Sequence, residues 1–269
     1  YRSHGYAAVV ARFNAKNPLD IIMKYPCSLS VIQDSLGIIV HSDYSIRLAK
    51  YWYGIDQGDW SVIPLVRTPF APDDKQSARD SLKIGKDDFL VCSFGHLGLA
   101  KLNHRLLSAW LDSSLANNKN CHLLFVGHNE GNDYGRKITH AIKRCVAADR
   151  IHITGWVDMS TYMQYLTAAD LAVQLRTLSR GETSAAVLDC MNYGIPTIVN
   201  ANGSMSDLDE NAVWKLPDEF DDKELVAALE TLWHDKSQRN MLGTRASQLI
   251  LRDHSPATCA AHYEKAIER

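Results

Sequence analysis

The sequence lacks the long apolar runs, paired cysteines and one-sided charge that mark several large classes of protein. None of its apolar runs approaches the roughly 20 residues that a membrane-spanning helix needs, and no secretory signal peptide is visible. The formal net charge of −2 gives no bulk attraction to nucleic acid or to membranes. The six cysteines, at positions 27, 92, 121, 145, 190 and 259, form no CxxC pair and no metal-ligand spacing. These absences favour a globular protein whose thiols stay reduced, as in the cytosol.

Several motifs of nucleotide-dependent and metal-dependent enzymes are missing as well. The glycines of GHLGLA (95–100) lie three residues apart, which differs from the GxGxxG dinucleotide fingerprint. No GxxxxGK[ST] loop occurs, and the histidines show neither HExxH nor HxH spacing. These absences argue against a dehydrogenase, a kinase and a catalytic metal ion.

Apolar strands alternate with amphipathic helices over most of the chain. The strands are continuous apolar runs, which indicates burial on both faces, and their alternation with helices predicts a parallel sheet with right-handed crossovers. The expected fold is therefore α/β, with a Rossmann-like sheet and helices on both faces; residues 1–25 show too little periodicity to be assigned. Strands are expected at 37–42, 61–65, 88–94, 121–127, 150–155, 169–175 and 196–200. Helices are expected at 26–36, from the end of the first strand to about 53, and at 75–83, 101–117, 132–147, 159–167, 184–193, 222–234, 236–251 and 255–268.

The segment between Leu175 and Pro217 carries the strongest functional signal. A loop with Arg176 and Arg180 leads into Gly-Glu-Thr-Ser at 181–184, and a helix is expected from Ala185. Hydroxyl residues at a helix start usually serve only as caps, but the free N–H groups there also bind anions. Glu182 is unsuited to phosphate and better suited to sugar hydroxyls. Thr183, Ser184 and Ala185 at the helix start, with Glu182 beside them, predict a nucleotide-sugar site.

Other strand ends place further candidates at the same edge of the sheet, where open parallel sheets bind their ligands. Lys101 begins a predicted helix, where the dipole disfavours a cation unless an anion lies between them; the alternative is a solvated surface lysine. Asp189 follows Glu182 by about two helical turns and could reach a ribose, or it could be an ordinary helix residue. The remaining candidates are Gly95 and His96 after one strand and Gly155, Trp156 and Val157 after another.

Three segments resemble the donor domain of retaining glycosyltransferases of family 4, which have two Rossmann-like domains. They are GHLGLAKLNHRLLSAW, RIHITGWVDMSTYMQYLTAADLAVQLR and GETSAAVLDCMNYGIPTIVNANGSMSDL, and the resemblance covers roughly 36–268. It implies that Lys101 binds the donor diphosphate, together with the N–H groups at 183–185 and with Arg176 or Arg180, and that 155–157 hold the base. It also implies that Glu182 grips the donor sugar, with Lys101 and Glu182 as the catalytic pair. The sequence departs from the family in two places: His96 stands where arginine is usual, and Glu182 lies one residue after the usual first glutamate.

The resemblance implies metal-independent transfer of a sugar from a nucleotide diphosphate, with UDP, GDP or another nucleotide in the donor and no cofactor. The acceptor would be a carbohydrate or a lipid-linked glycan of surface polysaccharide biosynthesis. The protein would act in the cytoplasm, with at most peripheral association at the inner face of the membrane and no nucleic-acid partner.

The same resemblance implies that the chain is the C-terminal portion of a longer enzyme. Residues 1–72 would be the end of an acceptor-side domain with its linker, 73–252 the donor-binding domain, and 253–269 a helix that packs back on the first domain. Asp43, Tyr44 and Ser45 would lie near the cleft, unless they only cap a helix. Two other functions remain open: a non-catalytic nucleotide-sugar-binding or interaction module, and a sugar-nucleotide epimerase of the same architecture.

Overall fold

The computed structural model describes residues 4–15, 21, 25–26, 28–54, 58–70 and 74–268. Its main body is a six-stranded, entirely parallel sheet in the order β5-β4-β3-β6-β7-β8. The predicted α/β fold with a Rossmann-like sheet is therefore confirmed. The strands are β3 (Phe89–Phe94), β4 (Cys121–Val126), β5 (Ile151–Ile153), β6 (Leu171–Gln174), β7 (Thr197–Asn200) and β8 (Trp214–Leu216).

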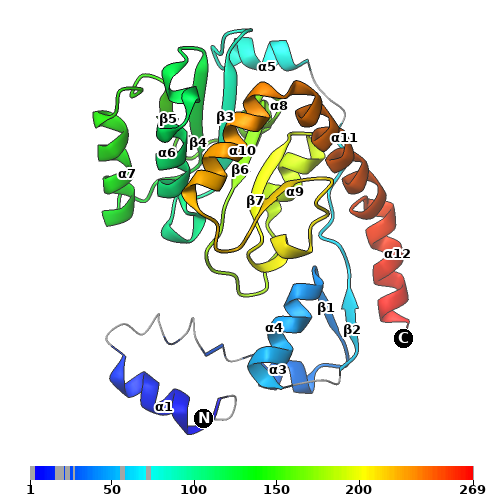
Figure 1. Cartoon of the computed structure of the whole chain (residues 1–269). Coiled ribbons are helices and arrows are strands. Elements are labelled where there is room, and N and C mark those ends of the chain that lie inside the picture. The colour runs from blue at the N-terminus through cyan, green and yellow to red at the C-terminus, as the bar shows by residue number, and fades with distance from the viewer. Residues whose placement is uncertain are drawn as a thin grey trace.

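Helices cover both faces of this sheet, as Figure 1 shows. Alternate residues of β3 separate the two faces: Val91 belongs to the core under α6, α7 and α10, whereas Leu90 belongs to the core under α5 and α8. All residues of β3 are buried, which explains why its sequence is apolar at every position. The helices are α5 (Lys75–Ser81), α6 (Asn103–Asp112), α7 (Asp133–Arg144), α8 (Met159–Ala168), α9 (Ala185–Asn192), α10 (Asp222–His234) and α11 (Lys236–Asp253).

A smaller N-terminal unit lies below this body in Figure 1. Its two short strands pair in parallel, with Ile38 opposite Trp60. The C-terminal helix runs back beside it, because the Cys259 thiol lies 3.2 Å from the Pro64 carbonyl oxygen and the Arg67 N–H donates to the His254 carbonyl at 2.8 Å. The elements are α1 (Gly5–Asn14), α3 (Leu29–Asp34), β1 (Ile38–Val40), α4 (Asp43–Tyr53), β2 (Trp60–Val62) and the C-terminal α12 (Pro256–Ile267).

The structure departs from the sequence predictions at several elements. β8 and α1 were not predicted: β8 has only three residues, and α1 buries no side chain. The helix expected over 101–117 is three pieces, namely η1 (Leu99–Lys101), α6 and η2 (Ser114–Asn117), because Leu102 adopts a left-handed backbone between the first two. Lys101 therefore ends a short 3₁₀ turn and does not begin a helix.

The first helix after the N-terminal segment also starts later than expected, at Leu29 and not at 26. Position 27 lies outside the described residues, and so do positions 71–73 of the predicted linker. The loop before β8 contains a further 3₁₀ turn, η3 (Gly203–Asp207). No helix in the described part of the chain has both the length and the apolarity that crossing a bilayer requires.

Candidate functional site

The centre of the sheet contains a topological switch point between β3 and β6. From β3 the chain proceeds outward to β4 and β5, and from β6 it proceeds in the other direction to β7 and β8. The backbone pairing of β3 with β6 ends at Cys92 and Ala172, before either strand ends. Ligands of open parallel sheets bind outside the carboxyl ends at such a point, so the loops after these two strands form the expected site.

Two buried side-chain amides continue the sheet where its backbone pairing stops. Gln174, with its amide oriented to suit both partners, donates to the Phe94 carbonyl at 3.1 Å and accepts from the Phe94 N–H at 2.8 Å. Asn200, at the end of β7, accepts from the Arg176 N–H at 2.8 Å and donates to the Arg176 carbonyl at 2.7 Å. On the other side, the Thr177 N–H donates to the Ala100 carbonyl at 3.1 Å. The backbone of Arg176 is therefore fixed between β7 and η1.

Arg176, Glu182 and Lys101 come together at this point. The Arg176 guanidinium forms an ion pair with the Glu182 carboxylate, and only 13% of the Arg176 side chain is exposed, against 47% for Glu182. Burial and the charge of Arg176 lower the pKa of Lys101 to about 8, and the charge of Glu182 opposes this effect. Two cations and one carboxylate thus share the switch point, which leaves positive charge available for an anion.

The start of α9 is built from hydroxyl residues that do not cap it. Ser184 holds the N-cap position and is buried, yet its side chain makes no capping hydrogen bond to the described residues. The Thr183 hydroxyl oxygen is also buried and has no hydrogen-bond partner in the part of the chain that the structure describes. Since the first N–H groups of a helix have no intrahelical partner, hydroxyls and N–H groups at Ala185 and its neighbours are suited to an anion.

The loop before α9 is held by other segments. The Arg180 N–H donates to a Glu182 carboxylate oxygen at 2.7 Å, and the Ser204 hydroxyl donates to the Glu182 carbonyl at 3.0 Å. The Ser45 hydroxyl, from the start of α4, donates to the Gly181 carbonyl at 2.6 Å. Gly181 has φ +98°, a conformation that suits glycine. The loop that carries Glu182 is thus held by contacts from α4 and from η3.

Tyr44 of α4 also faces this site. Burial raises the pKa of its hydroxyl, and the negative charges of Asp218 and Glu182 raise it further. The turn at 43–45, expected near the cleft, lies against the 181–182 loop, because the Ser45 hydroxyl donates to the Gly181 carbonyl, and against η3, because Asp207 accepts from the Tyr44 N–H. Sequence reasoning missed Asn200 and Ser204; an asparagine at the end of the apolar strand PTIVN was the available signal for Asn200.

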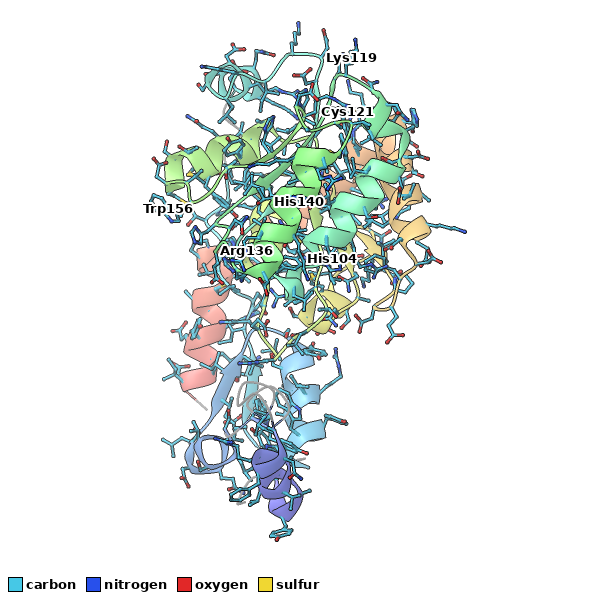
Figure 2. All side chains as sticks on the ribbon, turned by 90° about the vertical axis from the view of Figure 1, so that its left-hand side faces the viewer. His104, Lys119, Cys121, Arg136, His140 and Trp156 are labelled. Atoms are coloured by element: carbon cyan, nitrogen blue, oxygen red, sulfur yellow. The ribbon has the colours of Figure 1, made fainter. Side chains whose placement is uncertain are left out.

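The remaining sequence candidates lie on neighbouring loops of the same edge. Gly95 and Gly155 both have positive φ, +107° and +75°. His96 points to the loop after β4, with its Nε2 3.4 Å from a Glu130 carboxylate oxygen. Trp156 is 78% exposed and lies at the outer edge of the main body in Figure 2, whereas Val157 packs against the core.

Asp189 has partners within the protein. One carboxylate oxygen lies 2.8 Å from Nε of Arg67 in the segment after β2, and the other accepts from the Tyr162 hydroxyl at 3.2 Å. Burial raises the pKa of Asp189 in spite of the attraction of Arg67. These contacts hold the N-terminal segment against α9, and a contact of Asp189 with ribose stays a prediction.

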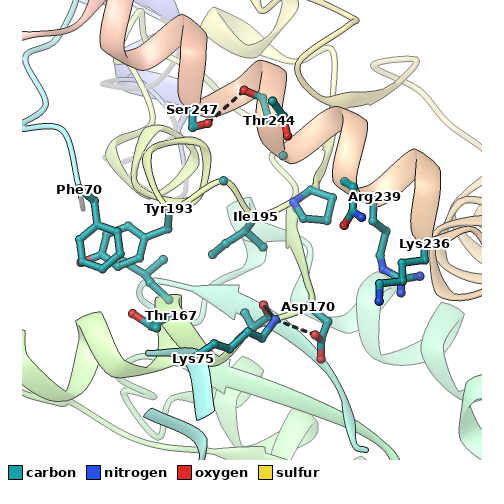
Figure 3. A pocket seen from close by; sticks show the side chains of 16 residues that line it. Phe70, Lys75, Thr167, Asp170, Tyr193, Ile195, Lys236, Arg239, Thr244 and Ser247 are labelled. Carbon is teal, nitrogen blue, oxygen red and sulfur yellow. Dashed lines mark hydrogen bonds and ion pairs between the residues drawn. The ribbon is translucent and has the colours of Figure 1, made fainter. Parts of the chain in front are cut away.

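A cavity of about 710 Å³ lies at the opposite, amino-terminal edge of the sheet, between α11 and the starts of β6 and β7 (Figure 3). Several of its charged groups already serve the fold. Lys75 donates to Asp170 at 2.7 Å, and Arg239 donates to the Trp233 carbonyl at 2.7 Å. Phe70 and Tyr193 stack on each other at 3.7 Å between ring centroids. This cavity is therefore separate from the cations and hydroxyls of the switch point.

Comparisons with solved structures show the same fold. The chain is similar to sucrose-phosphate synthase from Thermosynechococcus elongatus (19% identity, TM-score 0.75), covering 100% of this chain and 66% of that one. It is similar to HepE from Anabaena in complex with UDP-glucose (15%, TM-score 0.71), covering 98% and 67%. It is also similar to WaaG, a glycosyltransferase involved in lipopolysaccharide biosynthesis (15%, TM-score 0.72), covering 97% and 71%. The chain thus spans about two thirds of the length of these proteins.

No match was found among curated proteins. The sequence profile of the family described as "Glycosyl transferases group 1" matches residues 74–249, which is more than half of the chain and includes the switch point with Lys101, Arg176 and Glu182. The chain therefore belongs to the group 1 glycosyl transferase family.

Proposed function

We propose that this chain is the donor-binding part of a retaining glycosyltransferase of family 4, which transfers a sugar from a nucleotide diphosphate to a carbohydrate or lipid-linked acceptor. One observation carries the proposal: Lys101, Arg176 and the uncapped start of α9 converge at the switch point, with Glu182 beside them. Cations and N–H groups stabilise a departing diphosphate, because they are already oriented toward the charge that develops on it. Glu182 supplies acceptors for the hydroxyls of the sugar.

The nucleotide that we favour is uridine diphosphate, because solved structures of the similar HepE contain UDP and UDP-glucose; GDP is the second candidate. In this proposal 155–157 hold the base, and neither a metal ion nor a cofactor takes part. Residues 1–72 would belong to the acceptor side, 73–252 to the donor side, and 253–269 to the returning helix. The role would be surface polysaccharide synthesis in the cytoplasm, with at most peripheral contact with the inner face of the membrane.

Calorimetric titration of the chain with UDP, GDP and ADP tests the proposal. Micromolar binding of one nucleotide is expected, and Lys101→Ala should weaken it by roughly 10- to 100-fold, the worth of one charge-assisted hydrogen bond. Glu182→Gln should spare the nucleoside diphosphate and weaken only the intact nucleotide-sugar. If none of the three nucleotides binds, a non-catalytic interaction module becomes the better description.

The stereochemical part of the proposal has a separate test. If transfer is observed with a UDP-sugar donor, proton NMR of the first product should show the anomeric configuration of the donor. A product of inverted configuration would exclude a retaining enzyme, and release of free nucleotide with an epimerised sugar would indicate the epimerase.

A further inference from the structure

The side chain of His96 lies against a carboxylate on the loop after β4. Its Nε2 lies 3.4 Å from Glu130, and nearly half of the side chain (46%) is exposed. An anion beside His96 would therefore meet the negative charge of Glu130. Lys101 is a single cation, whereas a nucleoside diphosphate carries several negative charges, so a further cation is needed to balance them.

Arg176 is the cation placed to supply this balance. Asn200 and Ala100 fix the backbone around it, as described above, and its side chain is almost fully covered. The Thr177 N–H donates to the Ala100 carbonyl, so Arg176 and Lys101 lie on two segments joined by a backbone hydrogen bond, and the charge of Arg176 lowers the pKa of Lys101. Arginine suits phosphate because its planar group donates two parallel hydrogen bonds. In the structure, the Arg176 guanidinium is paired with the Glu182 carboxylate.

We infer that Arg176, and not His96, is the second cation for the donor diphosphate, and that donor binding exchanges the carboxylate of Glu182 for the diphosphate. This inference rests on the proposed function. In the structure Glu182 pairs with Arg176. When the diphosphate takes the place of this carboxylate, Glu182 is released to bind the hydroxyls of the sugar. The Glu182 carboxylate is thus available for the sugar only when a diphosphate has replaced it on Arg176.

The charges around the site favour this exchange. Lys101 and Arg176 carry like charges, and Glu182 pairs with Arg176 while its charge also acts on Lys101. A diphosphate offsets both cations together, with help from the N–H groups at the start of α9. The Glu182 carboxylate stays close after the exchange, because the Ser204 hydroxyl holds its backbone carbonyl at 3.0 Å.

Titration with UDP of a set of single variants tests which cation is used. Arg176→Met should weaken UDP binding by roughly 10- to 100-fold, and Arg176→Lys should give an intermediate value, because lysine keeps the charge and loses the planar fork. His96→Ala should stay within about threefold of the wild type, since a contact already shared with Glu130 in solvent is worth little. Arg144→Met, at the exposed C-terminal end of α7 and away from the carboxyl edge of the sheet, is the matched control and should leave UDP binding unchanged.

Titration of Glu182→Gln with UDP and with UDP-glucose tests the exchange. Loss of the counter-ion should leave UDP binding unchanged or strengthen it by up to about tenfold, because Arg176 no longer has an ion pair to break. The same variant should lose the extra affinity that UDP-glucose has over UDP. Thermal unfolding of each variant establishes that it is folded.

The outcomes distinguish a failure of this inference from a failure of the proposed function. UDP binding to Arg176→Met within twofold of the wild type would overturn the assignment of Arg176, and a Glu182→Gln variant that binds UDP as weakly as Arg176→Met would overturn the exchange. If UDP, GDP and ADP all fail to bind the wild type, the proposed function itself falls, and this inference falls with it.

Discussion

The environment of Lys101 destabilises the charged form of its side chain. Burial and Arg176 lower its pKa to about 8, and an anion bound beside it raises that pKa again. Between these two pKa values the bound state holds more protons than the free state. UDP affinity should therefore be highest below pH 8 and fall by up to about tenfold per pH unit above it, as measured by calorimetry between pH 7 and 9.5. Lys101→Arg, which stays protonated, should flatten this dependence; an unchanged slope would show that another group titrates.

Asp170 is the residue on which a buried charge network depends. Its side chain is 17% exposed and binds Arg79 at 2.9 Å, Lys75 at 2.7 Å and the Leu90 N–H at 2.8 Å. Removing the carboxylate leaves the buried Arg79 without its counter-ion, so Asp170→Ala should lower the free energy of unfolding by about 3 kcal/mol. The exposed pair of Asp133 with Arg136 is the control, and Asp133→Ala should cost at most about 1 kcal/mol in the same urea titration. Equal losses would show that the network adds nothing.

At the scale of elements, α11 crosses the end of α9 at a point where two glycine backbones meet. A Cβ on Gly243 would lie 2.1 Å from the Gly194 carbonyl oxygen, and Gly194 itself has φ +64°. Gly243→Ala should separate the two elements and lower the free energy of unfolding by about 1–3 kcal/mol, although alanine is the better helix former. Gln248→Ala, on the exposed side of α11, should change it by less than about 0.5 kcal/mol. An unchanged free energy of unfolding in Gly243→Ala would mean that α9 and α11 can separate at this point without loss of stability.

At the scale of the whole molecule, the N-terminal unit is joined to the main body through α4. The Ser42 side chain at the N-cap of α4 makes no capping hydrogen bond. Instead the Tyr44 N–H donates at 2.8 Å to Asp207 of η3, which lies 163 residues after Tyr44. Asp207 also pairs with Arg47. Asp207→Ala should therefore speed hydrogen exchange in α4 by roughly fivefold, the effect of losing a cap worth about 1 kcal/mol. Amides of β3 and β4 should exchange at the wild-type rate; equal acceleration there would mean a general loss of stability.

Local chemistry accounts for most of what could be predicted about the fold. Strands buried on both faces are apolar at every position, so β3, β4, β6 and β7 stand out in the sequence, and α10 is marked by a capping box of Asp221 and Glu224. A three-residue strand such as β8 has too few side chains to show a period, and Leu102 ends the turn at Lys101 with a left-handed backbone that its residue type disfavours. Both therefore had to be found in the structure.

The parallel α/β fold and the set of loops at its carboxyl edge follow from the order of the residues, because strand periodicity and residue type are local properties. The same order assigns Lys101, Arg176 and Glu182 to those loops. How these residues are paired is visible only in the folded chain. His96 is directed to Glu130, Asp189 to Arg67, and Arg176 to Glu182 beside Lys101. The physical reason is that charge pairing depends on distances in space between loops far apart in the chain, and the strand order of the sheet sets those distances.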